Sequence, residues 1–213
     1  MGSQCLLRAE DLCFERDDLC VIDHFNFELN PGDILQVEGS NGSGKTTLLR
    51  LLSTALHPSS GRILYDEKEL SDCRYEYCSN ILFIGHQIAL KDSLTPAENL
   101  DWLSAIKLSN DSILKALDLV GLRDYVNIPN IRLSAGQQRR VTLARLLLSN
   151  AKIWFLDEPF TAIDAQGVRL VKHLIEDHSK KGGAVVLSTH QSLDMVNIRR
   201  LCLSNEESGA NLW

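Results

Sequence analysis

The sequence predicts an α/β fold with a parallel sheet whose strands are buried on both faces. Four short apolar runs are each followed at once by glycine or polar residues, and segments with helical spacing separate them. The runs are Ile34–Val37, Ile81–Ile84, Ile153–Leu156 and Val185–Leu187. Nearly continuous apolar runs are typical of strands buried on both faces. Because ligands of such sheets gather beyond the carboxyl ends of the strands, we expect the four ends to form one site.

Three segments between and beside these runs have helical patterns. Leucines recur through Lys45–Leu56, which a proline- and glycine-containing stretch follows. Residues 96–125 read as helical and lie between two apolar runs, which predicts a helical insertion in the sheet domain. A further helix is expected from Ser134 to about Ser149, and Ser134 with Gln137 has the form of a capping box.

Composition limits the classes of protein to consider. The 213 residues are 44% hydrophobic and 23% charged, which is typical of one globular domain, with or without an insertion. The 22 Lys and Arg against 28 Asp and Glu give a net charge of −6, which argues against a nucleic-acid partner. No apolar run approaches the ~18 residues that span a bilayer, and no secretory signal is visible. We therefore expect a chain that stays in the cytosol unless a partner holds it at a membrane.

The first strand end carries a glycine-rich loop that matches G-x-x-x-x-G-K-[ST]. We expect its residues and the next one to contact a nucleotide: Gly39, Ser40, Asn41, Gly42, Ser43, Gly44, Lys45, Thr46 and Thr47. Glycines let the backbone wrap closely, so that successive N–H groups and the helix N-terminus point at phosphate oxygens. Lys45 would then reach the β and γ phosphates, and Thr46 would offer a hydroxyl to Mg²⁺. The strand before the loop and the helix after it argue against a mere turn.

Two adjacent acids follow the third apolar run. Asp157 is placed for the Mg²⁺ shell of a phosphate site. Neighbouring residues of an extended chain point in different directions, so Glu158 is free to orient or polarise an attacking water. A solvated turn is the alternative, and the glycine loop in the same chain argues against it.

Three further side chains are candidates by position. His190 follows the last apolar run and is expected to contact the γ-phosphate, which makes it a catalytic candidate with Glu158 and Lys45. Gln87 follows the second run and can reach water or Mg²⁺. Phe14 is the candidate for stacking on adenine, with a role in the core as the alternative.

The cysteines show no ligand pattern. No pair has C-x-x-C spacing, and no haem-attachment motif is present among Cys5, Cys13, Cys20, Cys73, Cys78 and Cys202. We expect small buried residues with reduced thiols. No histidines cluster near Cys73 and Cys78 to suggest a metal site there.

The segment Leu133–Gln137 resembles the signature sequence of ABC ATPases, an element that other P-loop proteins lack. The glycine loop, Gln87, Asp157–Glu158, Thr161–Asp164 and His190 follow in that family's order. The resemblance implies a P-loop core, an N-terminal antiparallel β portion that holds adenine, and an inserted helical subdomain. Residues 1–213 would form a single ABC ATPase domain. Its nucleotide-binding core with the β portion would take about 1–87 and 146–213, and its helical subdomain about 88–145.

In this family the signature faces the γ-phosphate held by another chain. The resemblance therefore implies that two copies bind head to tail around two ATP molecules, with these contacts in trans: Ser134, Ala135, Gly136, Gln137 and Asp164. Ala135 stands where glycine is usual, which still allows backbone donors to point at phosphate. Phe14 stands where tyrosine is usual.

A closer resemblance is to the ATPase subunits of bacterial cytochrome c maturation systems. Three of the segments that carry it are Leu94–Leu100, Arg132–Val141 and Phe160–Asp164. It implies integral membrane subunits as partners, a peripheral position on the cytoplasmic face of the inner membrane, and either haem export or ATP-driven release of a haem-loaded chaperone. Other readings are an ATPase for another small-substrate exporter, a soluble ABC ATPase acting on nucleic acid or ribosomes, and a nucleotide-gated scaffold without turnover.

Overall fold

The chain forms two compact units. The computed structural model describes residues 5–190, 193–195 and 197–203. The sheet unit comprises the described residues within Met1–Phe83, Ala151–Glu158 and Ile175–Trp213. The helical unit comprises Ile84–Asn150 and Pro159–Leu174. The helix α6 (Ala165–Lys180) contributes residues to both.

A parallel sheet in the order β6-β7-β8-β3-β9 contains all four predicted strands. Its strands are β3 (Ile34–Glu38), β6 (Ile81–Ile84), β7 (Ile153–Asp157), β8 (Ala184–Ser188) and β9 (Ile198–Cys202). Every residue of β7 and β8 is buried, as their continuous apolar sequences predict. The edge strand β9, which pairs in parallel with β3, was not predicted, because its IRRLC sequence has two arginines and only one buried residue.

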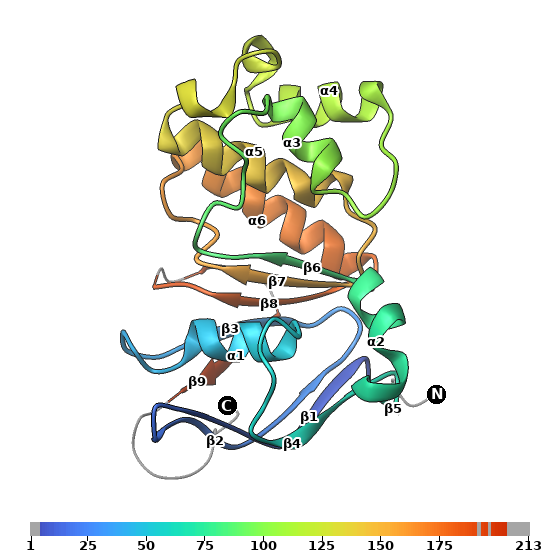
Figure 1. Ribbon diagram of the computed structural model, residues 1–213, viewed down its shortest axis with the longest axis vertical. Coiled ribbons are helices and arrows are strands. Elements are labelled where there is room, and N and C mark those ends of the chain that lie inside the picture. Colours follow the sequence, from blue (N-terminus) through green and yellow to red (C-terminus); the bar gives the residue numbers. More distant parts are fainter. Residues whose placement is uncertain (1–4, 191–192, 196, 204–213) are drawn as a thin grey trace. The chain divides into compact units, whose positions relative to one another are not determined.

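The sheet unit also contains an antiparallel sheet in the order β2-β1-β4-β5 (Figure 1). Its strands are β1 (Leu7–Arg16), β2 (Leu19–Leu29), β4 (Ser60–Tyr65) and β5 (Lys68–Glu69). The N-terminal antiparallel portion expected from the family resemblance is thus present. The pairing of β1 with β2 is irregular, with register shifts between Ala9 and Leu12 and on both sides of Phe14.

Two helices complete the sheet unit, α1 (Lys45–Leu52) and α2 (Leu70–Ser79). The leucines of α1 are fully buried in a core cluster shared with both sheets. The helix ends earlier than predicted, at the C-cap Ser53, and the prediction that it reaches Leu56 is wrong. Thr54 has a φ of 62°, a left-handed conformation that stops the helix before the proline.

The helical unit contains α3 (Pro96–Trp102), α4 (Asn110–Leu119), α5 (Ala135–Leu148) and two short 3₁₀ turns, η1 (Arg123–Tyr125) and η2 (Asn130–Arg132). The predicted helical stretch 96–125 is therefore broken twice. Ser109 caps a new helix through a hydrogen bond from the Ser112 N–H, and Gly121 ends that helix with a φ of 71°. The predicted helix from Ser134 to about Ser149 is confirmed.

The loop before α3 is organised by Asn99, which has no exposed surface. Its side chain accepts a hydrogen bond from the Lys91 N–H (2.8 Å) and donates to the carbonyls of Lys91 (3.0 Å) and Leu94 (3.2 Å). A buried amide with all these partners fixes a loop that has no regular structure of its own. None of the helices among the described residues combines the length and hydropathy that a bilayer crossing needs.

The prediction that the cysteines are buried is wrong for most of them. Cys5 and Cys73 are buried, Cys13 is half-buried, and Cys20, Cys78 and Cys202 are exposed. All six thiols are free.

Candidate functional site

The glycine loop runs from β3 into α1 and leaves backbone N–H groups without side-chain partners. Gly44 is the N-cap of α1 with a φ of 94°, so no side chain caps the first turn of the helix. Gly39 has a φ of 151°, and a Cβ there would collide with Ser43 and lie 2.7 Å from the carbonyl oxygen of Leu203. The buried Ser43 hydroxyl has no hydrogen-bond partner among the described residues. A helix start without a side-chain cap and a buried hydroxyl without a partner among the described residues fit a phosphate group.

Lys45 and Thr46 begin α1, and their side chains already have oxygen partners. Lys45 Nζ donates to the carbonyl oxygens of Gly39 (2.7 Å) and Ser40 (2.8 Å). Thr46 Oγ1 donates to Asp157 Oδ2 at 2.9 Å, which brings the end of β7 to the glycine loop. A hydroxyl beside a buried carboxylate is the oxygen donor set that Mg²⁺ prefers.

Ser188, the last residue of β8, holds both adjacent acids. Its hydroxyl donates to Asp157 Oδ1 at 2.7 Å and accepts from the Glu158 N–H at 3.1 Å. Glu158 has a φ of 50°, a conformation uncommon for residues other than glycine. Its N–H also donates to the Ser188 carbonyl at 3.2 Å. Ser188 is not among the residues predicted from the sequence, although a hydroxyl directly after a buried apolar run was an available signal.

The Glu158 carboxylate lies next to His190, as their positions at strand ends predict. His190 Nε2 is 3.4 Å from Glu158 Oε1. The Glu158 side chain is 17% exposed and that of His190 is 56% exposed. Glu158 is therefore mostly enclosed by protein, while His190 faces solvent. The sheet unit thus connects Thr46, Asp157, Glu158 and His190 through Ser188.

The other predicted nucleotide contacts of the sheet unit lie in the glycine loop, in the first turn of α1 and, for Phe14, in β1. Ser40, Asn41 and Gly42 are exposed in the loop, and Thr47 is half-buried in the first turn of α1. Phe14 is half-buried in β1 and packs against the core cluster, so its role toward adenine stays a prediction.

The signature segment begins α5 in the helical unit. The predicted capping box is confirmed, because Ser134 Oγ accepts from the Gln137 N–H (3.3 Å) and Gln137 Oε1 accepts from the Ser134 N–H (2.8 Å). Ala135 and Gly136 form the first turn. A Cβ at Gly136 would lie 3.1 Å from the Ala162 carbonyl oxygen, so the signature packs closely against the segment that contains Asp164.

Asp164 caps α6 and is held by an arginine of α5. Its Oδ1 accepts from the Gly167 N–H at 2.9 Å, and its Oδ2 accepts from Arg140 at 2.7 Å. The hydrogen bond from Gly167, followed by the positive charge of Arg140, holds the pKa of Asp164 below its ordinary value, although partial desolvation opposes this. Arg140 is not among the residues predicted from the sequence.

Gln87 is exposed in the loop after β6. Arg139 donates to the Gly85 carbonyl in the same loop at 2.9 Å. The contact of Gln87 with Mg²⁺ stays a prediction.

Removing the Ser188 hydroxyl tests whether it organises the acids. We expect Ser188→Ala to lower the free energy of unfolding by about 1.5–3 kcal/mol, because buried Asp157 loses a charge-assisted hydrogen bond. ATP turnover should fall as well, since Glu158 loses an anchor. Urea unfolding and a phosphate-release assay measure both, with exposed Ser93→Ala as the control. Equal values for the two variants would contradict this role.

A glycine loop between a buried strand and a helix, with lysine, threonine and a strand-end aspartate, defines a P-loop nucleotide-binding protein. The sequence pattern described as ABC transporter matches residues 22–161. The chain belongs to the ABC transporter family and is an ABC-type ATPase, which binds ATP.

Individual relatives agree with this assignment. The cytochrome c biogenesis ATP-binding export protein CcmA of Yersinia pestis is 45% identical over 206 residues, or 95% of this chain and 94% of the relative. An ABC transporter ATP-binding protein of Pyrococcus furiosus superimposes with a TM-score of 0.79 at 30% identity, covering 92% of this chain and 96% of that one. A dimeric ATP-binding cassette bound to ADP and Pi has the same fold, with a TM-score of 0.79, 23% identity, and coverage of 93% and 94%.

Proposed function

We propose that the chain is the ATP-hydrolysing subunit of a membrane ABC transporter complex for bacterial cytochrome c biogenesis. The hydrogen-bonded group of Thr46, Asp157, Ser188 and Glu158, with His190 beside it, carries the ATPase part of the proposal. The identity to an export protein named for cytochrome c biogenesis, over nearly the whole chain, supports the rest. Hydrolysis would power haem export or the release of a haem-loaded chaperone.

The residues of the sheet unit supply the chemistry of hydrolysis. The loop N–H groups and Lys45 bind the phosphates. Mg²⁺, when bound by Thr46 and Asp157, would neutralise phosphate charge. Gln87, a residue of the helical unit, is proposed as a further ligand of this ion. The Glu158 carboxylate accepts a proton from the attacking water, and we assign its neighbour His190 the role of donating an imidazole N–H to the γ-phosphate.

The helical unit supplies contacts to the ATP of a second copy. The capped α5 directs its first N–H groups away from the helix, and such a terminus binds anions. We assign these contacts to Ser134, Ala135, Gly136 and Gln137, with Asp164 positioned by Arg140. Two ATP molecules then join two chains head to tail, and hydrolysis separates them.

Membrane subunits are the other partners, with the chain on the cytoplasmic face of the bacterial inner membrane. We place their contact at residues 88–102, directly after Gln87, because the segment that follows a predicted nucleotide contact can transmit its movement to a partner. Trp102 supports this, because its side chain is 53% exposed and carries Lys91 Nζ 3.8 Å above its ring. An exposed indole is an effective anchor for a partner.

The c-type cytochrome content of cells tests the proposal. We expect a strain whose only copy carries Glu158→Gln to lose covalent haem staining of its c-type cytochromes, while Glu76→Gln, at an exposed glutamate of α2, leaves staining unchanged. Integral membrane proteins should also co-purify with the tagged protein from a detergent extract of the membranes. Normal haem staining of c-type cytochromes in the Glu158→Gln strain would contradict the role in cytochrome c biogenesis. It would not contradict the ATPase activity, which a phosphate-release assay measures separately.

A further inference from the structure

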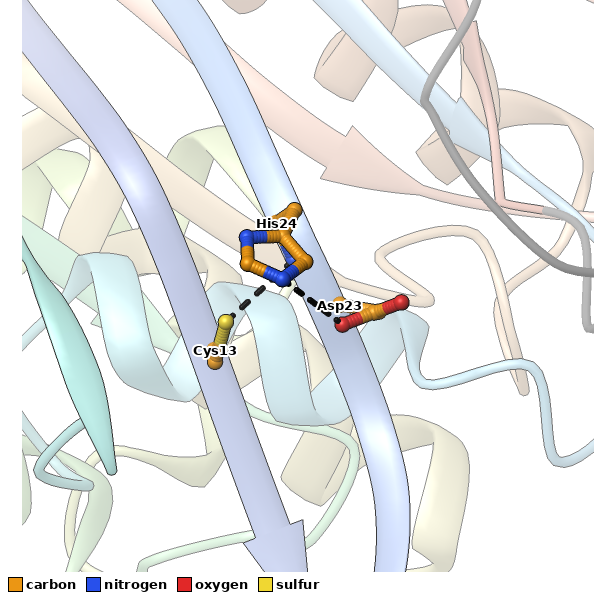
Figure 2. A group of neighbouring side chains, drawn as sticks. All are labelled: Cys13, Asp23 and His24. Atoms are coloured by element: carbon orange, nitrogen blue, oxygen red, sulfur yellow. Dashed lines mark hydrogen bonds and ion pairs between the residues drawn. The ribbon is translucent and has the colours of Figure 1, made fainter.

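The β1–β2 hairpin of the sheet unit gathers three metal-ligating side chains that the nucleotide site does not use. Cys13 lies on β1, and Asp23 and His24 lie on β2 (Figure 2). One potential ligand atom from each lies within 4.8 Å of those of the other two. The backbone N–H of His24 donates to Cys13 Sγ at 3.3 Å, which ties the two strands together at this point.

A fourth residue, Asp11, sets the orientation of the imidazole. Asp11 Oδ1 lies 2.5 Å from His24 Nδ1, within hydrogen-bonding distance. A carboxylate on Nδ1 places a proton there in the neutral ring and leaves the Nε2 lone pair available. His24 Nε2 lies 3.8 Å from Asp23 Oδ1. Histidines that bind a metal through one ring nitrogen commonly donate the N–H of the other to a carboxylate, which is the place of Asp11 here.

The irregular backbone of the hairpin brings these groups to one place. Asp11 and His24 have φ values of 50° and 41°, at the register shifts where β1 and β2 depart from regular pairing. The Asn26 side chain accepts from the Asp11 N–H at 3.0 Å and donates to the His24 carbonyl at 2.9 Å. Asn26 therefore connects the two distorted residues and keeps their side chains on the same part of the hairpin.

We propose that Cys13, Asp23 and His24 bind a zinc ion, with Asp11 orienting the His24 ring. A thiolate, an imidazole and a carboxylate are all zinc ligands, at about 2.0–2.3 Å from the ion. Ligand atoms of a tetrahedral site with these bonds lie roughly 3.3–3.8 Å apart. Exposed Asp23 and His24 close the remaining gap by small rotations, and water fills the fourth position. The proposal is independent of ATP hydrolysis.

Cobalt titration of the reduced, full-length protein tests this site, because a Co²⁺–thiolate bond produces a charge-transfer absorption band. We expect the band to saturate at one Co²⁺ per chain and to vanish when Zn²⁺ displaces the cobalt. Cys13→Ser should abolish the band, and His24→Asn, which tolerates a positive φ, should weaken zinc binding about 100-fold. Asp11→Asn should weaken it about 10- to 100-fold.

Cys78→Ser is the matched control, because Cys78 is an exposed thiol on α2 and belongs to another part of the sheet unit. It should retain both the band and the zinc affinity. ATP binding by each variant shows that it is folded. A band that persists in folded Cys13→Ser, or zinc affinity unchanged in both His24→Asn and Asp23→Asn, would overturn the proposal.

Discussion

Replacing Glu158 by glutamine is expected to lower steady-state ATP turnover about 100- to 10,000-fold. Glutamine has nearly the same shape, but it cannot accept a proton from the attacking water. The N–H of residue 158 keeps its hydrogen bonds to Ser188, so the conformation at the end of β7 should persist. ATP affinity should therefore change little. A phosphate-release assay and a fluorescent-ATP titration separate the two effects.

Glu76→Gln serves as the control for charge, because it removes the same charge from the exposed face of α2. Its turnover should equal that of the parent protein. If Glu158→Gln kept more than about a tenth of the parent turnover, Glu158 would not be the base.

The second large effect is expected from Ser134→Asp. Aspartate caps helices as well as serine does, so α5 should remain folded. In the proposed dimer, however, a carboxylate at this position faces the γ-phosphate of the second copy, and two like charges about 4 Å apart repel by roughly 4 kcal/mol near a protein surface. We expect turnover to fall roughly 100- to 1,000-fold, with ATP binding to the isolated chain unchanged.

Ser134→Asn separates this charge effect from loss of the cap. Asparagine is also a good N-cap but is neutral, so its turnover should stay within about tenfold of the parent. Equal turnover of the aspartate and asparagine variants would show that no phosphate approaches the start of α5.

The parallel sheet was predictable because strands buried on both faces have nearly continuous apolar sequences. The strands β7 and β8 are apolar almost throughout, and the polar residues that end them sit at the site. The glycine loop was predictable for a similar reason, since few other backbones need that spacing. The edge strand β9 has water on one side and carries arginines, so the same reasoning missed it.

Helix ends were harder to predict than helices. The apolar pattern continues to Leu56, but the positive φ of Thr54 ends α1 before it. Ser109 and Gly121 interrupt the stretch 96–125 in a similar way, through local capping that apolar spacing does not reveal. The helix α6 was not singled out, although buried Val171 and Ile175 give it a helical spacing.

Four of the site residues that were predicted from their position at strand ends or in the glycine loop are in contact in pairs. Thr46 bonds to Asp157, and Glu158 lies next to His190. Ser188 holds Asp157 and Glu158, and Arg140 holds Asp164, through contacts between segments far apart in the chain. Sequence spacing alone carries no such information. The cysteines were misjudged for the opposite reason, because residue type predicts burial only on average.

The most direct test of the account is the mass in solution of the Glu158→Gln protein, measured by light scattering with and without Mg-ATP. We propose that each chain holds ATP on its glycine loop and lends its signature helix to a neighbour, so we expect the mass of one chain without nucleotide and of two with it. Adding Ser134→Asp should return the mass to that of one chain. A mass that stays at one chain with saturating ATP would contradict the shared site.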